Sequence, residues 1–279
     1  MRVLTTLGMH RVSMGKSGLR CALVVIPAML LLAGCHTIQV PDPNDPMDAS
    51  PAQLAGVLQL NIKQMADSLN DRVGSGPGQI TDQQRLDFLS DEAKHLLSLG
   101  DPAHARPQDA WIYANLYITS DQFDKAIPLL KEAIAYAASV NDDDRRVNDS
   151  LRLARALAKT GHVAESLNLV QSVIDSKPKD PGPVLPSVLL EITPLTEGKG
   201  HDEQLAKLLE ESIHEHLRVV VDPKTLPGQS FLMAKPHHIE NAWYKIVTLL
   251  QSSGHPAQAK AAQVRSEQMM QTLQPAATL

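Results

Sequence analysis

The sequence predicts an all-α protein built from helix–turn–helix repeats. Three observations favour this fold class. After Gly100, apolar residues recur at spacings of three and four, which places them on one face of a helix. No convincing run alternates between apolar and polar residues as a strand does. Segments 108–138 and 148–178 share a pattern, which indicates a repeated unit. The alternative is a generic helical bundle with accidental matches.

The first 34 residues have the pattern of a secretory signal peptide. Four basic residues and no acidic residue precede an uncharged apolar run over 21–34. This run is too short to span a bilayer, because a membrane-spanning helix needs about 20 apolar residues. A buried core helix fits poorly, since Pro27 interrupts the run. We therefore expect residues 1–34 to direct export and to be removed.

The residues at the end of this run indicate a lipid anchor. The motif LAGC at 32–35 resembles the bacterial lipobox, in which the peptide is cut before the cysteine and the cysteine is lipidated. The resemblance implies a bacterial lipoprotein with lipidation at Cys35, held in the membrane by several acyl chains. An ordinary cleaved signal is the alternative. The family retains proteins in the inner membrane by an aspartate after the cysteine. His36 stands there instead, which favours the outer membrane, facing the periplasm.

The composition of the mature protein excludes several classes of function. Removal of 1–34 leaves 22 basic and 31 acidic residues, a net charge of −9, which argues against binding to nucleic acid. Cys35 becomes the only cysteine, so packing and not a disulfide must stabilise the fold. Nine aromatic residues are too few to favour a stacking site for bases or sugars. The sequence therefore indicates an acidic helical protein.

The segment before the repeats divides into a tether and a pair of helices. Residues 35–50 are rich in proline and aspartate and are predicted to be a disordered tether. Residues 51–100 are predicted to form two helices, separated by the glycine-rich stretch 74–78. Thr81 and Gln84 have the spacing of a capping box, which starts the second helix.

Residues 107–178 carry the repeats, and both copies resemble the tetratricopeptide repeat (TPR), a helix–turn–helix unit of about 34 residues. The matching positions of the first copy are Ala114, Tyr117, Phe123, Ala126 and Ala133, and those of the second are Ala154, Leu157, Gly161 and Pro178. Small residues at such positions let paired helices approach closely. The resemblance implies a short right-handed solenoid that binds other proteins.

The match to the repeat pattern is incomplete. The two copies are offset by 40 residues, and the polar stretch 141–146 supplies the excess. Ser166 replaces a small alanine, and Pro128 falls inside a predicted helix. Residues 183–275 are expected to hold degenerate repeats, with Trp243, Gly254 and Ala259 at family positions. Residues 222–236 are predicted to form an ordered surface loop within them, with a short β-hairpin as an alternative.

No catalytic or cofactor motif is present. The sequence lacks G-x-S-x-G and H-E-x-x-H, so we predict no enzyme, no cofactor and no metal centre. Six of the eleven histidines follow residue 200, and Glu210 with His214, or His237 with Glu240, have helical spacing suited to metal ligands. Solvated histidines are the favoured interpretation. A periplasmic ligand- or metal-binding protein that uses this histidine-rich third is the alternative function.

The inner face of the predicted repeats is the candidate binding surface. The resemblance assigns to it Asn115 and Ile118 in the first copy, Asn148, Arg152, Arg155 and Lys159 in the second, and Asn241 and Lys245 in the C-terminal copy. Arginine forks suit carboxylates, and asparagine hydrogen-bonds a peptide backbone. We hypothesise a site for an acidic segment or for the carboxyl terminus of another protein. The alternative is that these are exposed residues that balance the acids at 142–144.

These observations together predict a membrane-anchored envelope lipoprotein that acts as a scaffold or adaptor for envelope proteins or their peptide segments. Nucleic acid is not expected as a partner.

Overall fold

The computed structural model describes residues 44–47, 49–50, 52–74, 76 and 78–273, and all structural statements concern these residues. The predicted signal peptide 1–34, Cys35 and most of the tether lie outside the described residues. Within the described part, no helix has the length and apolar character needed to cross a membrane.

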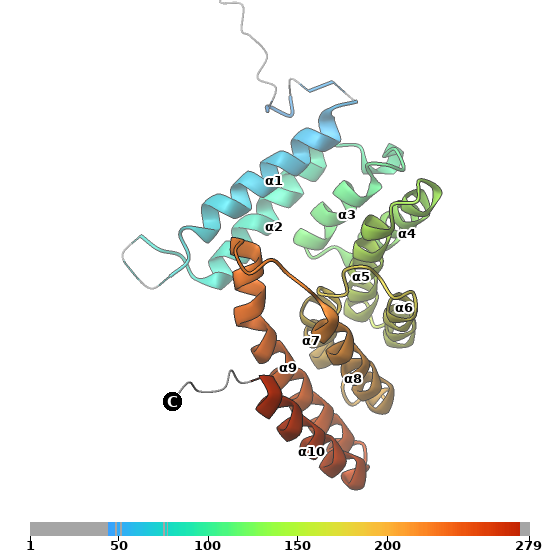
Figure 1. Ribbon diagram of the computed structural model, residues 1–279. Helices are drawn as coiled ribbons and strands as arrows, with labels where there is room; N and C mark the ends of the chain where they lie inside the picture. Colours follow the sequence, from blue (N-terminus) through green and yellow to red (C-terminus); the bar gives the residue numbers. More distant parts are fainter. Residues whose placement is uncertain (1–43, 48, 51, 75, 77, 274–279) are drawn as a thin grey trace, which may run out of the picture. The chain divides into compact units, whose positions relative to one another are not determined.

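The described part of the protein is helical, which confirms the all-α prediction (Figure 1). Its α-helices are α1 (Leu54–Asn70), α2 (Asp82–Leu99), α3 (Ala110–Thr119), α4 (Phe123–Ser139), α5 (Asp143–Lys159), α6 (Val163–Asp175), α7 (Leu190–Thr196), α8 (Asp202–Arg218), α9 (Leu226–Ser252) and α10 (Pro256–Leu273). A 3₁₀ turn (η1, Pro102–His104) and a π-helical turn (η2, Leu185–Leu189) join them. The predicted capping box starts α2, where the Thr81 side chain accepts a hydrogen bond from the Gln84 N–H.

Helices that follow one another in sequence pack together, as repeats require. Helix α3 packs on α4, α4 on α5, α5 on α6, α8 on α9 and α9 on α10. The turn η2 and helix α7 lie against α5 and α8. Figure 1 shows α9 and α10 side by side at the C-terminal end of the protein.

The small residues of the repeat pattern lie at the helix contacts. Ala114, Ala126, Ala133 and Ala154 are all fully buried, so paired helices approach closely. Ser166, which replaces an alanine of the pattern, is buried as well. Its Oγ donates a 2.6 Å hydrogen bond to the Ala154 carbonyl, joining α6 to α5. The departure from the pattern therefore adds a bond between helices and leaves no buried hydroxyl unpaired at this position.

Several turns between consecutive α-helices contain a residue with a positive φ. In four of them the φ values are 60° at Asp121, 56° at Asn141, 86° at Gly161 and 85° at Gly254. Glycine adopts this left-handed conformation without steric cost, and aspartate is among the residues that tolerate it. Of the extra residues at 141–146, Asn141 and Asp142 lie in the turn between α4 and α5, and the other four form the first turn of α5. Asp142 caps this helix by accepting from the Arg145 N–H. Pro128 lies beyond the first turn of α4, so the Asp124 carbonyl loses its helical donor.

Two large hydrophobic cores share helix α5. Leu153, Ala156 and Leu157 belong to the cluster formed with α1 to α4. Leu151 and Ala154 belong to the cluster formed with α6 to α10. Helix α5 is therefore covered by other helices on two faces, and it joins the N-terminal half of the described residues to the C-terminal half.

The prediction of an ordered surface loop over 222–236 is wrong, because helix α9 begins at Leu226. The Thr225 hydroxyl oxygen caps this helix by accepting from the Gly228 N–H at 3.1 Å, and the same hydroxyl donates to the Asp222 carbonyl at 3.0 Å. Pro227 occupies the first turn, where its missing N–H costs nothing. No strand occurs in this described segment, so the alternative of a β-hairpin is wrong as well.

Replacing Gly228 with alanine is expected to destabilise the start of α9. A Cβ at this position would lie 2.0 Å from the Asp222 carbonyl oxygen, so the backbone must move, at a cost of about 1–3 kcal/mol. Gly56→Ala in α1 is the matched control, since its Cβ would meet nothing within 4 Å. That variant is expected to gain about 0.5–1 kcal/mol. Urea unfolding measures both, and equal stability of the two variants would contradict the close approach.

Candidate functional site

A groove of about 790 Å³ lies between α2, the turn from α3 to α4, and α5. Its lining includes the apolar side chains of Leu86, Ile118 and Phe123, and the charged side chains of Asp87, Lys94, Asp121, Arg155 and Lys159. We call this the α2–α5 groove. It brings Ile118 together with Arg155 and Lys159, three of the residues that the repeat resemblance assigned to a binding surface.

The groove has an exposed apolar part. Leu86 of α2 is 50% exposed, so half of its side chain remains in contact with water. Ile118 and Phe123 are partly buried against the N-terminal core and line the same groove. These three side chains form a surface on which an apolar side chain of a ligand can lose contact with water.

Two cations of α5 lie at the groove. Lys159 is exposed and has no ion-pair partner among the described residues, and its Nζ lies 5.7 Å from the centre of the Phe123 ring. The Nε of Arg155 lies 2.9 Å from an Oε of Glu191 on α7, with both side chains about 40% exposed. Because this contact uses Nε, the two Nη atoms of Arg155 remain available as donors.

Arg152 has a different environment from the other two cations of the predicted stripe. Its Nη1 lies 2.7 Å from Asp149, whose side chain is completely buried. Arg145 approaches the second carboxylate oxygen at 3.6 Å, and both guanidinium groups lie over the Trp111 ring. Burial raises the pKa of Asp149, and the two arginines oppose that shift. Arg152 therefore supports a buried carboxylate, and it does not line the α2–α5 groove.

The asparagines and Lys245 of the predicted surface lie apart from the groove lining. Asn115 is half-buried in α3, and the Asn148 amide donates to the Asp144 carbonyl at 2.9 Å. Asn241 lies exposed in α9, and Lys245 lies half-buried in the same helix.

The sequence analysis did not predict Leu86 as a residue of the binding surface. Its position in α2 between the polar residues Gln83 and Asp87 could have indicated an exposed apolar side chain.

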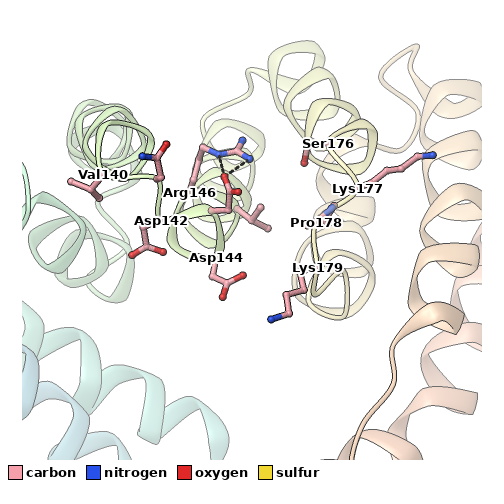
Figure 2. Close-up of a pocket in the computed structure, with 11 residues that line it drawn as sticks. Val140, Asp142, Asp144, Arg146, Ser176, Lys177, Pro178 and Lys179 are labelled. Atoms are coloured by element: carbon pink, nitrogen blue, oxygen red, sulfur yellow. Dashed lines mark hydrogen bonds and ion pairs between the residues drawn. The ribbon is translucent and has the colours of Figure 1, made fainter.

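A second hollow, of about 670 Å³, lies between the α4–α5 turn and residues 176–179 (Figure 2). Figure 2 shows Asp142 and Asp144 on one side of the hollow and Lys179 on the other, with the Lys177 side chain directed away from it. Arg146 pairs with Asp143 at 3.1 Å, and Asp142 is already used as the cap of α5. Charges of both signs thus lie around this hollow, and it offers no field of one sign to a ligand.

The histidines after residue 200 occupy different environments. His214 is exposed, and Glu210, its proposed partner, makes a two-bond contact with Arg265 at 2.8 and 3.0 Å. His216 is completely buried, contrary to the interpretation of solvated histidines. Within the described residues, no three potential metal ligands come together.

Arg152→Ala is expected to lower stability by roughly 2 kcal/mol, because it leaves the buried Asp149 with the more distant Arg145 alone. The loss is smaller than for a fully buried pair, since the Arg152 side chain is 38% exposed. Arg155→Ala, which breaks a solvent-exposed pair, is expected to cost less than about 1 kcal/mol. Urea unfolding of the two variants measures both losses in the free energy of unfolding. Adding Asp149→Asn to Arg152→Ala should restore part of the loss, and no restoration would exclude the carboxylate as its cause.

Comparison with known proteins gives structural similarity at low identity. No protein-family model matches the sequence, and no curated protein matches it. The crystal structure of nearly identical TPR-like repeats of a putative kinesin light chain from Podosopora anserina is 14% identical. It covers 81% of this protein and 99% of its own length, with a TM-score of 0.47. The crystal structure of BtubC from P. vanneervenii is 13% identical and covers 83% of this protein and 98% of its own length, with a TM-score of 0.38.

Proposed function

We propose that this protein is a scaffold or adaptor that binds extended segments of other proteins in the α2–α5 groove. The observation that carries the proposal is the combination of the half-exposed Leu86 with two cations of α5, Arg155 and Lys159, that line the same groove. Asp87 and Asp121 also line it, so the lining carries charges of both signs. Lys159 has no ion-pair partner among the described residues, which leaves its charge available to a ligand. No motif for catalysis competes with this function in the sequence.

The groove suits a segment with one apolar and one acidic side chain. The apolar side chain would contact Leu86, Ile118 and Phe123, where burial supplies affinity. The carboxylate would be placed between Lys159 and the Nη atoms of Arg155. Asp87 lines the groove, and Glu191 pairs with Arg155. These two carboxylates repel a ligand that carries further negative charges beside the one bound carboxylate.

The proposed location is the bacterial envelope. The apolar run over 21–34 and the LAGC motif support a lipid anchor at Cys35. His36 favours the outer membrane, with the helical part in the periplasm. The partners would then be other envelope proteins or their peptide segments.

Reversing the charge of Lys159 is expected to reduce partner binding without unfolding the protein, because this exposed lysine has no ion-pair partner among the described residues. The tagged full-length protein would be cross-linked in cells, and the captured envelope proteins identified by mass spectrometry. Peptides of the main partner would then be titrated onto Lys159→Glu, with an expected loss of at least tenfold. Lys63→Glu in α1 makes the same charge change outside the groove and serves as control. Equal binding by both variants would contradict the groove as the site.

Cys35→Ala is expected to release the protein from the membrane fraction. The anchor depends on acyl chains attached at this residue, each of which contributes about 0.8 kcal/mol per buried CH₂. Membrane fractionation of cells that express the variant measures the release. His36→Asp is the control that retains lipidation, with an expected shift to the inner membrane. A Cys35→Ala protein that stays with the membranes would rule out the lipid anchor.

A further inference from the structure

His216 is a buried ionisable group that the proposed binding site does not use. It lies in α8 with none of its surface exposed, and its ring packs 5.0 Å from Phe231 and 5.5 Å from His238 of α9. Neither of its ring nitrogens has a hydrogen-bond partner, and the Nδ1 of His238 has none either. Buried polar atoms in folded proteins are almost always paired, so this cluster needs a physical explanation.

The charges around His216 disfavour its protonated form. From α9 it is faced by His238 and by Lys235, whose Nζ donates to the Leu217 carbonyl at 3.1 Å. From the segment before η2, the Asp180 carboxylate and the Gly182 carbonyl favour the protonated form, but the carbonyl does not reach hydrogen-bond geometry. From α8 itself, Ser212 lies one turn earlier, and its buried hydroxyl is also unpaired. Besides burial, electrostatic repulsion from His237 contributes to the lowered pKa of His238.

The pKa of His216 is lowered from 6.5 to about 4, first by burial and then by His238 and Lys235. Burial also lowers the pKa of His238. A folded-state pKa below the ordinary value means that the packed form binds fewer protons than a form with a solvated ring. The packing of this cluster is therefore fully favoured above pH 6.5 and is lost as the pH falls towards 4.

The part of α9 that covers His216 is weakly attached to the rest of the molecule. We call residues 226–235 the α9 arm. Leu226 and Met233 in it are 78% and 82% exposed, and Gly228 is its only buried residue. The buried residues of α9 that join the C-terminal core begin at Ile239. Pro236 separates the two parts and cannot donate to the Leu232 carbonyl, which weakens the helix at this point.

We propose that protonation of His216 releases the α9 arm from α8, while the remainder of α9 keeps its place in the core. The arm and the residues before it form part of the wall of an open hollow of about 490 Å³, which Gly182, Pro183 and Val219 also line. Release of the arm removes Phe231 from this wall and from its contact with the His216 ring. The attachment of the arm is thus pH-dependent, and this role does not depend on the function of the α2–α5 groove.

Hydrogen exchange of the full-length protein between pH 7 and 4.5 tests the proposal, with rates corrected for the intrinsic effect of pH. The fall of the pKa to about 4 predicts a roughly 50-fold loss of protection over this range in peptides from the arm. Peptides from α4 and α5 should keep their protection. Loss of protection in all helices together, or in none, would overturn the proposal.

Variants separate His216 from the other titrating groups. His216→Phe keeps a buried ring without a titrating nitrogen, and we expect its arm to stay protected at both pH values. His214→Phe, on the exposed side of α8, should retain the wild-type loss. If His216→Phe does not fold, His216→Gln provides the same test with a neutral polar side chain. An unchanged pH dependence in the His216 variant that folds would overturn the proposal.

Discussion

The burial of helix α5 on two faces is the constraint on which the rest of the described structure depends. One face contributes Leu153 and Leu157 to the core with α1 to α4, and the other contributes Leu151 to the core with α6 to α10. Both contacts require small residues, and Ala154 and Ala156 are completely buried. A larger side chain at either position would separate the helices, because packed interiors leave no room for added volume.

The same burial determines which polar residues of α5 remain free to bind a partner. Asp149 lies inside the fold and engages Arg145 and Arg152, so these two arginines serve the structure. Towards the C-terminal end of α5, Arg155 and Lys159 reach the α2–α5 groove. The charge of these two residues is therefore placed next to the exposed Leu86 of α2. This placement, and not the number of basic residues, suits the groove to an acidic segment.

Local signals in the sequence predicted the local structure well. The capping box at Thr81, the turn at Gly161 and the small residues of the helix pairs depend on residues within one or two helical turns, and each was found as predicted. The loop over 222–236 was predicted wrongly, although the Thr225 cap spans only the three residues to Gly228 and Pro227 suits the first turn of a helix. This local helix-start signal was present in the sequence and was overlooked. The burial of Asp149 and of His216 arises from packing between helices, which helical spacing does not reveal. The pairing of Arg152 with Asp149 has i,i+3 spacing on one helix and could have been predicted from the sequence.

The shared helix also bears on how the protein unfolds. In many repeat arrays each unit touches only its neighbours, so ends can fray while the middle stays folded. Here loss of α5 would remove a wall from both cores at once, and the Ser166 hydroxyl bond to the Ala154 carbonyl ties α6 to the same helix. Cooperativity should therefore be concentrated at α5. A protein divided after residue 159 would leave the C-terminal half without one side of its core, so the two halves form one cooperative unit.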